Sequence, residues 1–327
     1  MRNHLLTITG FCLTATLAQA ETPVLTVYTY DSFTAEWGPG PIIETAFEAT
    51  CACDLQFVGS GDGAALLARV LLEGAGTQAD VVLGLDTNLT AKARESGIFA
   101  PHGVTAPLDL PVDWSDDTFL PFDWGWFAFV GNLGGAMPAN FRELADSDLK
   151  IVIEDPRSST PGLGLLFWVK QAYGDQAADI WTDLADNIVT VTPGWSEAYG
   201  LFLEGEADLV LSYTTSPAYH LIAENDATKV ALAFDEGHYL QIEVAAKVST
   251  TDVPELADQF MAFIVSESFQ SAIPTTNWMY PVVSLSSGLP EGFETMIQPE
   301  KSLLLSSTDS AAMRDGALEE WRNALSQ

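Results

Sequence analysis

Strand-like and helix-like segments alternate along this 327-residue chain, and that alternation limits the folds it can adopt. The segments VLTVYTY (24–30) and LQFV (55–58) have the composition of strands, and PIIETAFEAT (41–50) between them has helical spacing. A helix at 63–74 ends at a glycine and is followed by a buried strand at 79–84. This order predicts an α/β fold, with a mostly parallel sheet and helices on both of its faces.

The chain crosses between two such α/β units twice. Residues 119–132 (FLPFDWGWFAFVGN) have an aromatic strand pattern that leaves the first unit, and GHYLQIEVAAK (237–247) is a strand that returns to it. Two crossings predict two lobes joined by a hinge, with a ligand in the cleft at the strand ends. The predicted boundaries are 21–122 and 237–285 for lobe 1, 123–236 for lobe 2, and 286–327 for a C-terminal segment packed on lobe 2.

The first 20 residues, MRNHLLTITGFCLTATLAQA, are typical of a secretory signal peptide. They have a short basic start, an apolar stretch and a small-residue ending, Ala18-Gln19-Ala20. No later apolar run approaches the roughly 20 residues that a membrane helix needs. We therefore expect a signal peptide at 1–20 and export of the remaining chain to the bacterial periplasm.

The chain is strongly acidic, with 45 Asp and Glu residues against 13 Lys and Arg and a net charge of −32. Such a charge excludes nucleic acid and anionic membrane surfaces as partners, because both repel a negative protein. It is compatible with a cationic ligand.

No set of catalytic residues is recognisable. The chain lacks the G-x-S-x-G, H-E-x-x-H and P-loop motifs, and His102, His220 and His238 are far apart in sequence. The pair Cys51 and Cys53, in TCACD, either forms a small disulfide ring or stays reduced and buried. No further ligands lie nearby to complete a metal site. We expect a protein that is not an enzyme and holds no metal.

Two segments indicate binding of a charged ligand. In DPRSSTPGLG (155–164), Ser159 or Thr160 can cap a helix whose first turn holds Pro161, and the free N–H groups of such a helix start attract anions. In GSGDGAA, Asp62 is either the N-cap of the next helix or a carboxylate for the positive charge of a ligand. One pair of oxygens could serve both purposes.

Aromatic residues beside glycine and proline at the strand–helix junctions indicate a pocket for flat rings. Such rings stack on flat ligands, and tryptophan faces attract cations. The aromatic candidates are Tyr30, Trp37, Trp195, Tyr213, Tyr219, Trp278 and Tyr280. An anion cradle, several aromatic rings and an acidic cleft fit a ligand that is aromatic, cationic and phosphorylated, as thiamine phosphates are.

The same stretches resemble the thiamine-binding periplasmic proteins of bacterial ABC importers, over nearly the whole mature chain. The most specific are LTVYTYDSFTAEWGPGP, VTPGWSEAYGLFLEGE, DLVLSYTTSPAYH and IPTTNWMYPV. The resemblance implies a periplasmic-binding-protein type II fold that captures thiamine, thiamine monophosphate and thiamine diphosphate as transported ligands, not as cofactors. It also implies delivery to a membrane permease with its cytoplasmic ATPase, by a protein that we expect to be a monomer.

The resemblance further implies that both lobes contribute ligand contacts. Asp62 and Gly63 contact the ligand from lobe 1, with Tyr30 and Trp37 nearby. Ser159 and Thr160 hold the phosphate or hydroxyethyl end at the helix start. The residues expected to close over the ligand or to frame its rings are Trp195, Tyr213, Thr214, Thr215, Ser216, Pro217, Tyr219 and Trp278.

Two other functions are compatible with parts of this pattern. A receptor for ferric iron or another small anion has the same fold, but iron receptors of this type present adjacent tyrosines, and this chain has no Tyr-Tyr pair. A periplasmic enzyme that acts on thiamine esters could also use a phosphate site, but it would need a metal or a nucleophile set.

Overall fold

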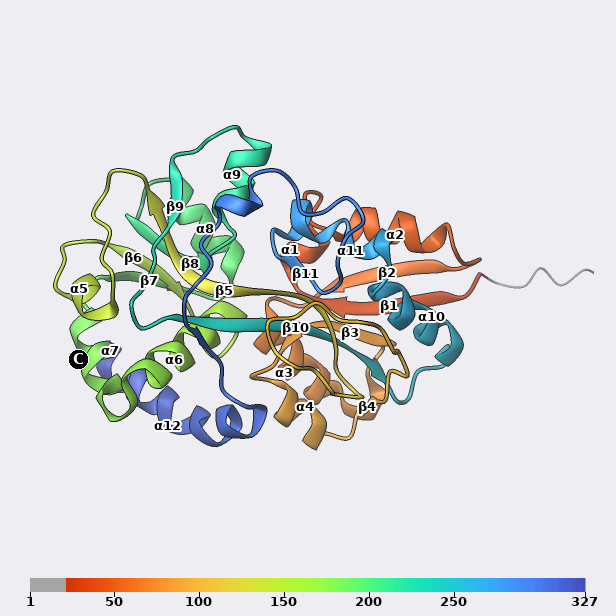
Figure 1. Ribbon diagram of the computed structural model, residues 1–327. Helices are drawn as coiled ribbons and strands as arrows, with labels where there is room; N and C mark the ends of the chain where they lie inside the picture. Colours follow the sequence, from red (N-terminus) through yellow and green to blue (C-terminus); the bar gives the residue numbers. More distant parts are fainter. Residues whose placement is uncertain (1–21, 327) are drawn as a thin grey trace, which may run out of the picture.

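A computed structural model describes residues 22–326 and shows two lobes side by side (Figure 1). The predicted signal peptide lies outside the described residues. The first elements of lobe 1 are β1 (Val24–Thr29), α1 (Asp31–Thr34), α2 (Gly40–Glu48), β2 (Asp54–Gly59), α3 (Gly63–Glu73), β3 (Val81–Asp86), α4 (Thr90–Glu95) and β4 (Phe99–Ala100). The strand β5 (Leu120–Asn132) then leads into lobe 2.

Lobe 2 is a second α/β unit. Its elements are α5 (Phe141–Ala145), β6 (Ile151–Glu154), α6 (Thr160–Tyr173), α7 (Ala177–Leu184), β7 (Ile188–Thr192), α8 (Trp195–Leu203), β8 (Leu209–Tyr213), α9 (Pro217–Ala223) and β9 (Lys229–Ala231). The strand β10 (His238–Val248) returns to lobe 1. The remaining elements are α10 (Pro254–Ile264), α11 (Glu267–Gln270), a π-helical turn (Ile273–Asn277), β11 (Tyr280–Pro281), a 3-10 turn (Phe293–Thr295), β12 (Ser302–Leu303) and α12 (Ser307–Leu325).

The sheet is mixed, with the strand order β2-β1-β3-β10-β5-β8-β6-β7. The outer strands of each lobe pair in parallel: β1 pairs with β2 and β3, and β6 pairs with β7 and β8. The strands β5 and β10 run antiparallel to each other and to their outer neighbours β8 and β3. The prediction of a mostly parallel sheet is therefore wrong at the junction, because the two crossing strands run in opposite directions.

The strand β5 belongs to both lobes. Its first part, from Leu120 to Trp126, pairs with β10, and its second part, from Phe127 to Gly131, pairs with β8. The helix α12 lies against α6 and α7 and also touches α4 (Figure 1). A long strand shared by both units supplies the hinge, while the lobe boundaries given above stay a prediction.

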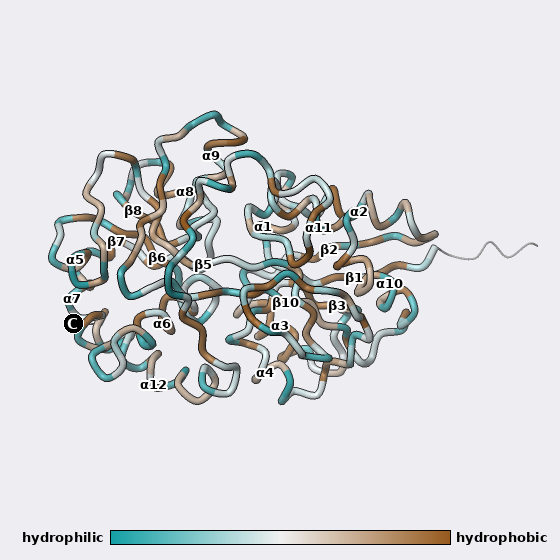
Figure 2. Tube along the Cα trace, in the orientation of Figure 1, coloured by the Kyte–Doolittle hydropathy of each residue, from teal (hydrophilic) through white to brown (hydrophobic). Residues whose placement is uncertain are grey.

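The apolar core follows the strands (Figure 2). One cluster, which includes Val82, Phe129 and Ile242, continues beneath both lobes. On the opposite face of the sheet the core divides into a cluster in lobe 1 with Val81 and a cluster in lobe 2 with Val130. Adjacent residues of a strand point to opposite faces, so one face carries a continuous core and the other has a gap between two cores.

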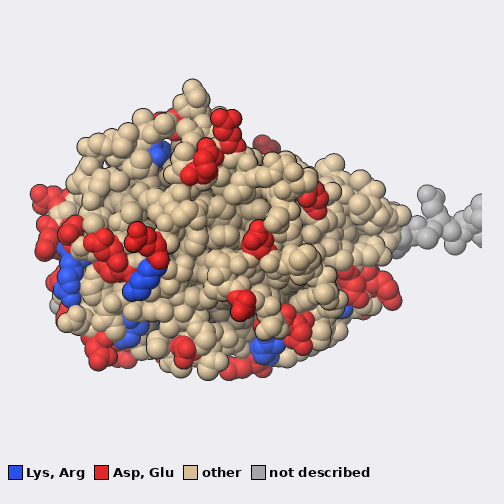
Figure 3. Space-filling model, in the orientation of Figure 1, with Lys and Arg blue, Asp and Glu red and all other residues tan. Residues whose placement is uncertain are grey.

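Acidic side chains are scattered over both lobes in the view of Figure 3, with few basic side chains beside them. This distribution fits a solvated negative surface. Among residues 22–326, no helix is both long and apolar enough to cross a membrane.

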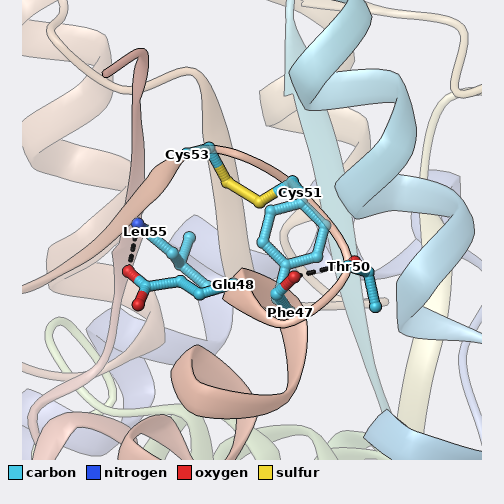
Figure 4. Close-up of a disulfide and its surroundings, with 6 residues drawn as sticks. All are labelled: Phe47, Glu48, Thr50, Cys51, Cys53 and Leu55. Carbon is cyan, nitrogen blue, oxygen red and sulfur yellow. Dashed lines mark hydrogen bonds between the residues drawn. A yellow bond between two sulfur atoms is a disulfide. The ribbon is translucent and has the colours of Figure 1, made fainter. Parts of the chain in front are cut away.

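The cysteine pair forms a disulfide in the turn between α2 and β2 (Figure 4). The Cα atoms of Cys51 and Cys53 are 5.3 Å apart. The same turn is held by Thr50 Oγ1, which donates to Phe47 O at 2.7 Å, and by Leu55 N, which donates to Glu48 Oε1 at 2.9 Å. Of the two states left open by the sequence, the structure has the disulfide.

Candidate functional site

The segment DPRSSTPG starts helix α6, as predicted. Ser159 is the N-cap, and its Oγ accepts a hydrogen bond from Gly162 N at 3.5 Å. Pro161 lies in the first turn, where its missing N–H costs no helical hydrogen bond. Because Ser159 and Thr160 are both buried, this helix start faces the protein interior between the lobes.

The carboxylate of Asp62 from lobe 1 occupies this helix start. Its Oδ2 accepts from Ser159 Oγ at 2.7 Å, and its Oδ1 accepts from Gly63 N at 2.9 Å. The backbone N–H groups of Thr160 and Trp195 also lie close enough to this carboxylate to lower its pKa. These donors begin α6, α3 and α8, so three helix N-termini, each of which favours negative charge, meet at one side chain. Asp62 is the N-cap of α3 and also a contact between the lobes.

Gly63 lets the two lobes touch at this point. A Cβ atom on Gly63 would lie 2.2 Å from Thr160 Oγ1, closer than any side chain could tolerate. Beside it, Ala65 N donates to Ser158 O at 3.0 Å across the same junction. Burial between the lobes raises the pKa of Asp62, and the hydrogen bonds from Ser159, Gly63, Trp195 and Thr160 oppose that rise.

Three more carboxyl groups lie near Asp62, and we call the four of them the acidic cluster: Asp62, Asp123, Glu154 and Glu243. All four are close enough to Tyr213 to raise the pKa of its phenol, after burial as the main cause. The position of Glu243 follows from strand alternation, because Leu240, Ile242 and Val244 face the shared core beneath the lobes. Glu243 therefore points to the opposite face of the sheet, into the gap between the core of lobe 1 and the core of lobe 2.

The acidic cluster is linked to lobe 1 through Tyr30. The Tyr30 hydroxyl donates to Glu243 Oε2 at 2.9 Å, and Asn277 Nδ2 lies 2.9 Å from that hydroxyl. Asn277 Nδ2 also donates to Asp123 Oδ2. Burial raises the pKa of Asp123 to about 7, and burial together with the charge of Asp123 raises the pKa of Glu243 well above its usual range.

The acidic cluster has no basic counterpart within the described part of the chain. None of the ion pairs there involves any of its four carboxyl groups. Glu154 is fully buried, and neither of its carboxyl oxygens has a hydrogen-bond partner among the described residues. A buried carboxyl group is costly unless it stays protonated or meets a positive charge, so this arrangement favours a cation.

Four aromatic residues meet across the junction, and we call them the aromatic rim: Trp37, Trp195, Tyr219 and Trp278. Trp37 of lobe 1 faces Trp195 of lobe 2 with ring centroids 6.3 Å apart, and the rings of Tyr219 and Trp278 are 5.3 Å apart. Trp37 is 55% exposed, and the other three are partly buried. Trp278 has a left-handed backbone, with φ of 57°, at the end of the π-helical turn.

Ser216, one of the residues expected around the ligand, is buried behind Trp195. It occupies the N-cap position of α9 but makes no cap hydrogen bond with its side chain. Its Oγ accepts from Tyr213 N at 3.2 Å and lies 2.7 Å from Ser212 Oγ, which in turn accepts from Trp195 Nε1 at 2.8 Å. Ser216 thus stabilises the position of Trp195.

Most of the other predicted residues are buried at the junction or in the core next to it. Thr214, Thr215 and Pro217 are buried after β8, and the hydroxyls of Thr160 and Thr214 have no hydrogen-bond partner among the described residues. Tyr30 is also buried and points toward Glu243. Tyr280 belongs to the core, because it is 4% exposed and stacks on Trp124 at 4.6 Å.

Sequence reasoning missed the interior acids and Asn277. The available signal was an acidic residue within an otherwise apolar strand pattern, as in LPFDWGW, IVIEDP and LQIEVAA. The histidines at 102, 220 and 238 each have different hydrogen-bond partners. His102 accepts from Val104 N at 2.9 Å and His238 accepts from Phe234 N at 3.0 Å, so both support backbone, while His220 lies behind the aromatic rim.

Comparison with known proteins identifies the family. Residues 39–271 match the family described as bacterial extracellular solute-binding protein. The chain belongs to this family. Proteins named thiamine-binding periplasmic protein from Escherichia coli (strain K12) and Haemophilus influenzae (strain ATCC 51907 / DSM 11121 / KW20 / Rd) are 52% and 46% identical to this solute-binding protein. The first alignment covers 93% of this chain and 94% of its relative, and the second covers 84% of each.

Solved structures confirm the fold. A periplasmic thiamin binding protein is 52% identical, with a TM-score of 0.91 over 94% of this chain and 98% of that one. Iron-bound HitA from Pseudomonas aeruginosa, at 19% identity and a TM-score of 0.74 over 92% of this chain and 99% of that one, shares the fold alone. The predicted type II fold, the resemblance to thiamine-binding periplasmic proteins and the periplasmic location are therefore confirmed. A family of solute-binding proteins also agrees with the prediction that this chain is not an enzyme.

Proposed function

We propose that this solute-binding protein captures thiamine in the periplasm and delivers it to the permease of an ABC importer. Thiamine is then a transported ligand, held between the lobes of a monomer, and not a cofactor. The observation that carries this proposal is the acidic cluster, which has no basic partner in the described chain and lies at a junction lined by the aromatic rim. The thiazolium ring of thiamine is flat and permanently cationic, so it suits both features.

The phosphorylated forms, thiamine monophosphate and thiamine diphosphate, are a further part of the proposal. Their phosphate would take the place of the Asp62 carboxylate at the starts of α3, α6 and α8. Support comes from the donors that already surround an anionic group there, namely Ser159 Oγ and the backbone of Gly63, Thr160 and Trp195. Backbone N–H groups at helix starts are well suited to phosphate.

Tryptophan fluorescence tests thiamine binding directly. Because Trp195 and Trp278 belong to the aromatic rim, we expect thiamine to quench the emission strongly and to raise the melting temperature as its concentration increases. Each stacked ring contributes about 0.5–1.5 kcal/mol beyond its buried area. If millimolar thiamine changes neither the emission nor the melting temperature, the proposed ligand is wrong.

A further inference from the structure

The aromatic rim is supported from behind by a polar network in lobe 2. Glu224 Oε1 accepts from the Tyr219 hydroxyl at 2.9 Å, and Glu224 Oε2 lies 2.7 Å from His220 Nδ1. The other ring nitrogen, His220 Nε2, lies 2.9 Å from the Tyr199 hydroxyl. One carboxylate therefore holds one rim residue directly and a second aromatic ring through His220.

That second ring supports the other rim residue of lobe 2. Trp195 stacks on Tyr199 with ring centroids 5.0 Å apart and an interplanar angle of 29°. Tyr199 lies nearly parallel to His220, at 5.9 Å and 18°. His220 is 1% exposed and Tyr199 is 6% exposed, so these two rings are closely packed and the orientation of one affects the other, whereas the Glu224 side chain is 44% exposed. Trp195 and Tyr219 thus both depend on the position of a single surface carboxylate.

The atoms of this network that could bind a metal ion already have hydrogen-bond or ion-pair partners in the protein. His220, Glu224 and Asp226 place one possible metal-ligand atom each within 4.8 Å of one another. However, Asp226 Oδ1 accepts from Thr228 N at 2.8 Å, and Asp226 Oδ2 lies 3.5 Å from Lys229 Nζ. Glu224 and His220 satisfy each other. The contacts favour a hydrogen-bonded support over a metal site.

We propose that Glu224, acting with His220, is a positioning residue that sets the geometry of the aromatic rim and thereby the affinity for thiamine. The inference rests on the proposed function. Without the carboxylate, Tyr219 loses the acceptor that fixes its ring, and His220 loses the partner that orients it toward Tyr199. Rings that are free before binding must be ordered during binding, which weakens the complex.

Replacement of Glu224 separates position from charge. Glu224→Ala should lower the affinity for thiamine about fivefold, the effect of one lost hydrogen bond, mostly through faster dissociation. Glu224→Gln should stay within about twofold of wild type, because its amide oxygen still accepts from Tyr219 and its amide nitrogen can donate to His220 Nδ1. Glu204→Ala removes an exposed carboxylate just after α8 in the same lobe and should leave the affinity unchanged.

A double-mutant cycle with Tyr219→Phe completes the test, with stopped-flow binding kinetics as the measurement. If Glu224 acts through Tyr219, the double variant should bind no more weakly than the weaker single variant. The inference is overturned if Glu224→Ala binds like Glu204→Ala, if the two losses add, or if Glu224→Gln loses as much as Glu224→Ala. Should Glu224→Ala fail to fold, a loss in Tyr219→Phe with none in Glu224→Gln supports the inference, and equal affinities in both overturn it. Absence of thiamine binding by the wild-type protein would instead refute the proposed function.

Discussion

The acidic cluster and the aromatic rim lie at the same junction between the lobes, but they are built differently. The acidic cluster is interior, and hydrogen bonds fix Asp62, Asp123 and Glu243 in place. The aromatic rim is partly exposed, and ring contacts hold it together. The interior part can select a ligand by charge, because a buried charge imposes a large penalty when it is unpaired. The outer part adds contact area, excludes water and attracts a cation only weakly, through its ring faces.

This difference also predicts which contacts resist opening. At Asp62 a carboxylate of lobe 1 is bound by donors of lobe 2, so separation of the lobes must break charge-assisted hydrogen bonds. At the aromatic rim, separation exposes only rings that are already partly in water. A ligand that supplies a new anion to the helix starts, or a new cation to Asp62, can replace the contact that opening removes. Closure by ligand therefore requires differential affinity for the closed form.

Asp62→Asn should have the largest effect of the substitutions. The change keeps the shape but removes the negative charge that faces a cation. We expect free thiamine to bind roughly tenfold or more weakly, since hydrogen bonds to charged groups contribute about 1.5–3 kcal/mol. Thiamine monophosphate should lose less, because its phosphate replaces the carboxylate at the helix starts. Calorimetric titration with both ligands measures this, with Asp113→Asn as the control at an exposed site of lobe 1. Equal losses for both ligands would rule out displacement of Asp62 by phosphate.

Ser159→Ala combined with Thr160→Ala should have the opposite preference. It removes two hydroxyls at the start of α6 and keeps the backbone donors. We expect thiamine monophosphate to bind about tenfold more weakly, which corresponds to about 1.4 kcal/mol, and free thiamine to lose clearly less. Calorimetry with the same two ligands decides this, and a larger loss for free thiamine would place the phosphate elsewhere.

The interior acids should make stability depend on pH, with a smaller effect. Burial raises the pKa of Asp123 to about 7, so the folded state binds this proton more tightly than the unfolded state. The resulting stabilisation is fully present below the unfolded pKa and is lost as pH rises through about 7. Asp123→Asn should flatten the decline in melting temperature between about pH 5 and pH 8 by roughly 2–4 °C. If the melting temperatures of the two ligand-free proteins change with pH in the same way, Asp123 ionises as easily in the folded protein as in the unfolded chain.

Much of the fold was predictable because its signals are local. The start of α6 follows from Ser159 and Pro161, and the two crossing strands follow from long apolar runs with aromatic residues. The direction of pairing at the junction was not predictable in this way. It depends on how β5 and β10 meet, and their paired residues are 114 to 125 positions apart in sequence (from 240 − 126 to 245 − 120), with Asp123 and Glu243 separated by 120.

The candidate site was predictable only in part, for the same reason. The rim aromatics lie in loops with glycine and proline, where sequence patterns are informative. The contact between Asp62 and Ser159 joins residues separated by 97 positions, and no local pattern predicts that one fills the helix start of the other. Glu154 is missed because an acidic residue at the end of a strand is usually at the surface, whereas here it is fully buried.

The charge of the ligand ring is the most direct test of the central claim that an uncompensated acidic cluster selects a cation. Calorimetric titration of the wild-type protein would compare thiamine with an analogue that has a neutral ring in place of the thiazolium. The acidic cluster predicts that thiamine binds at least about tenfold more tightly, a difference of about 1.4 kcal/mol or more. Equal affinities for the two ligands would contradict the claim and leave the aromatic rim as the basis of recognition.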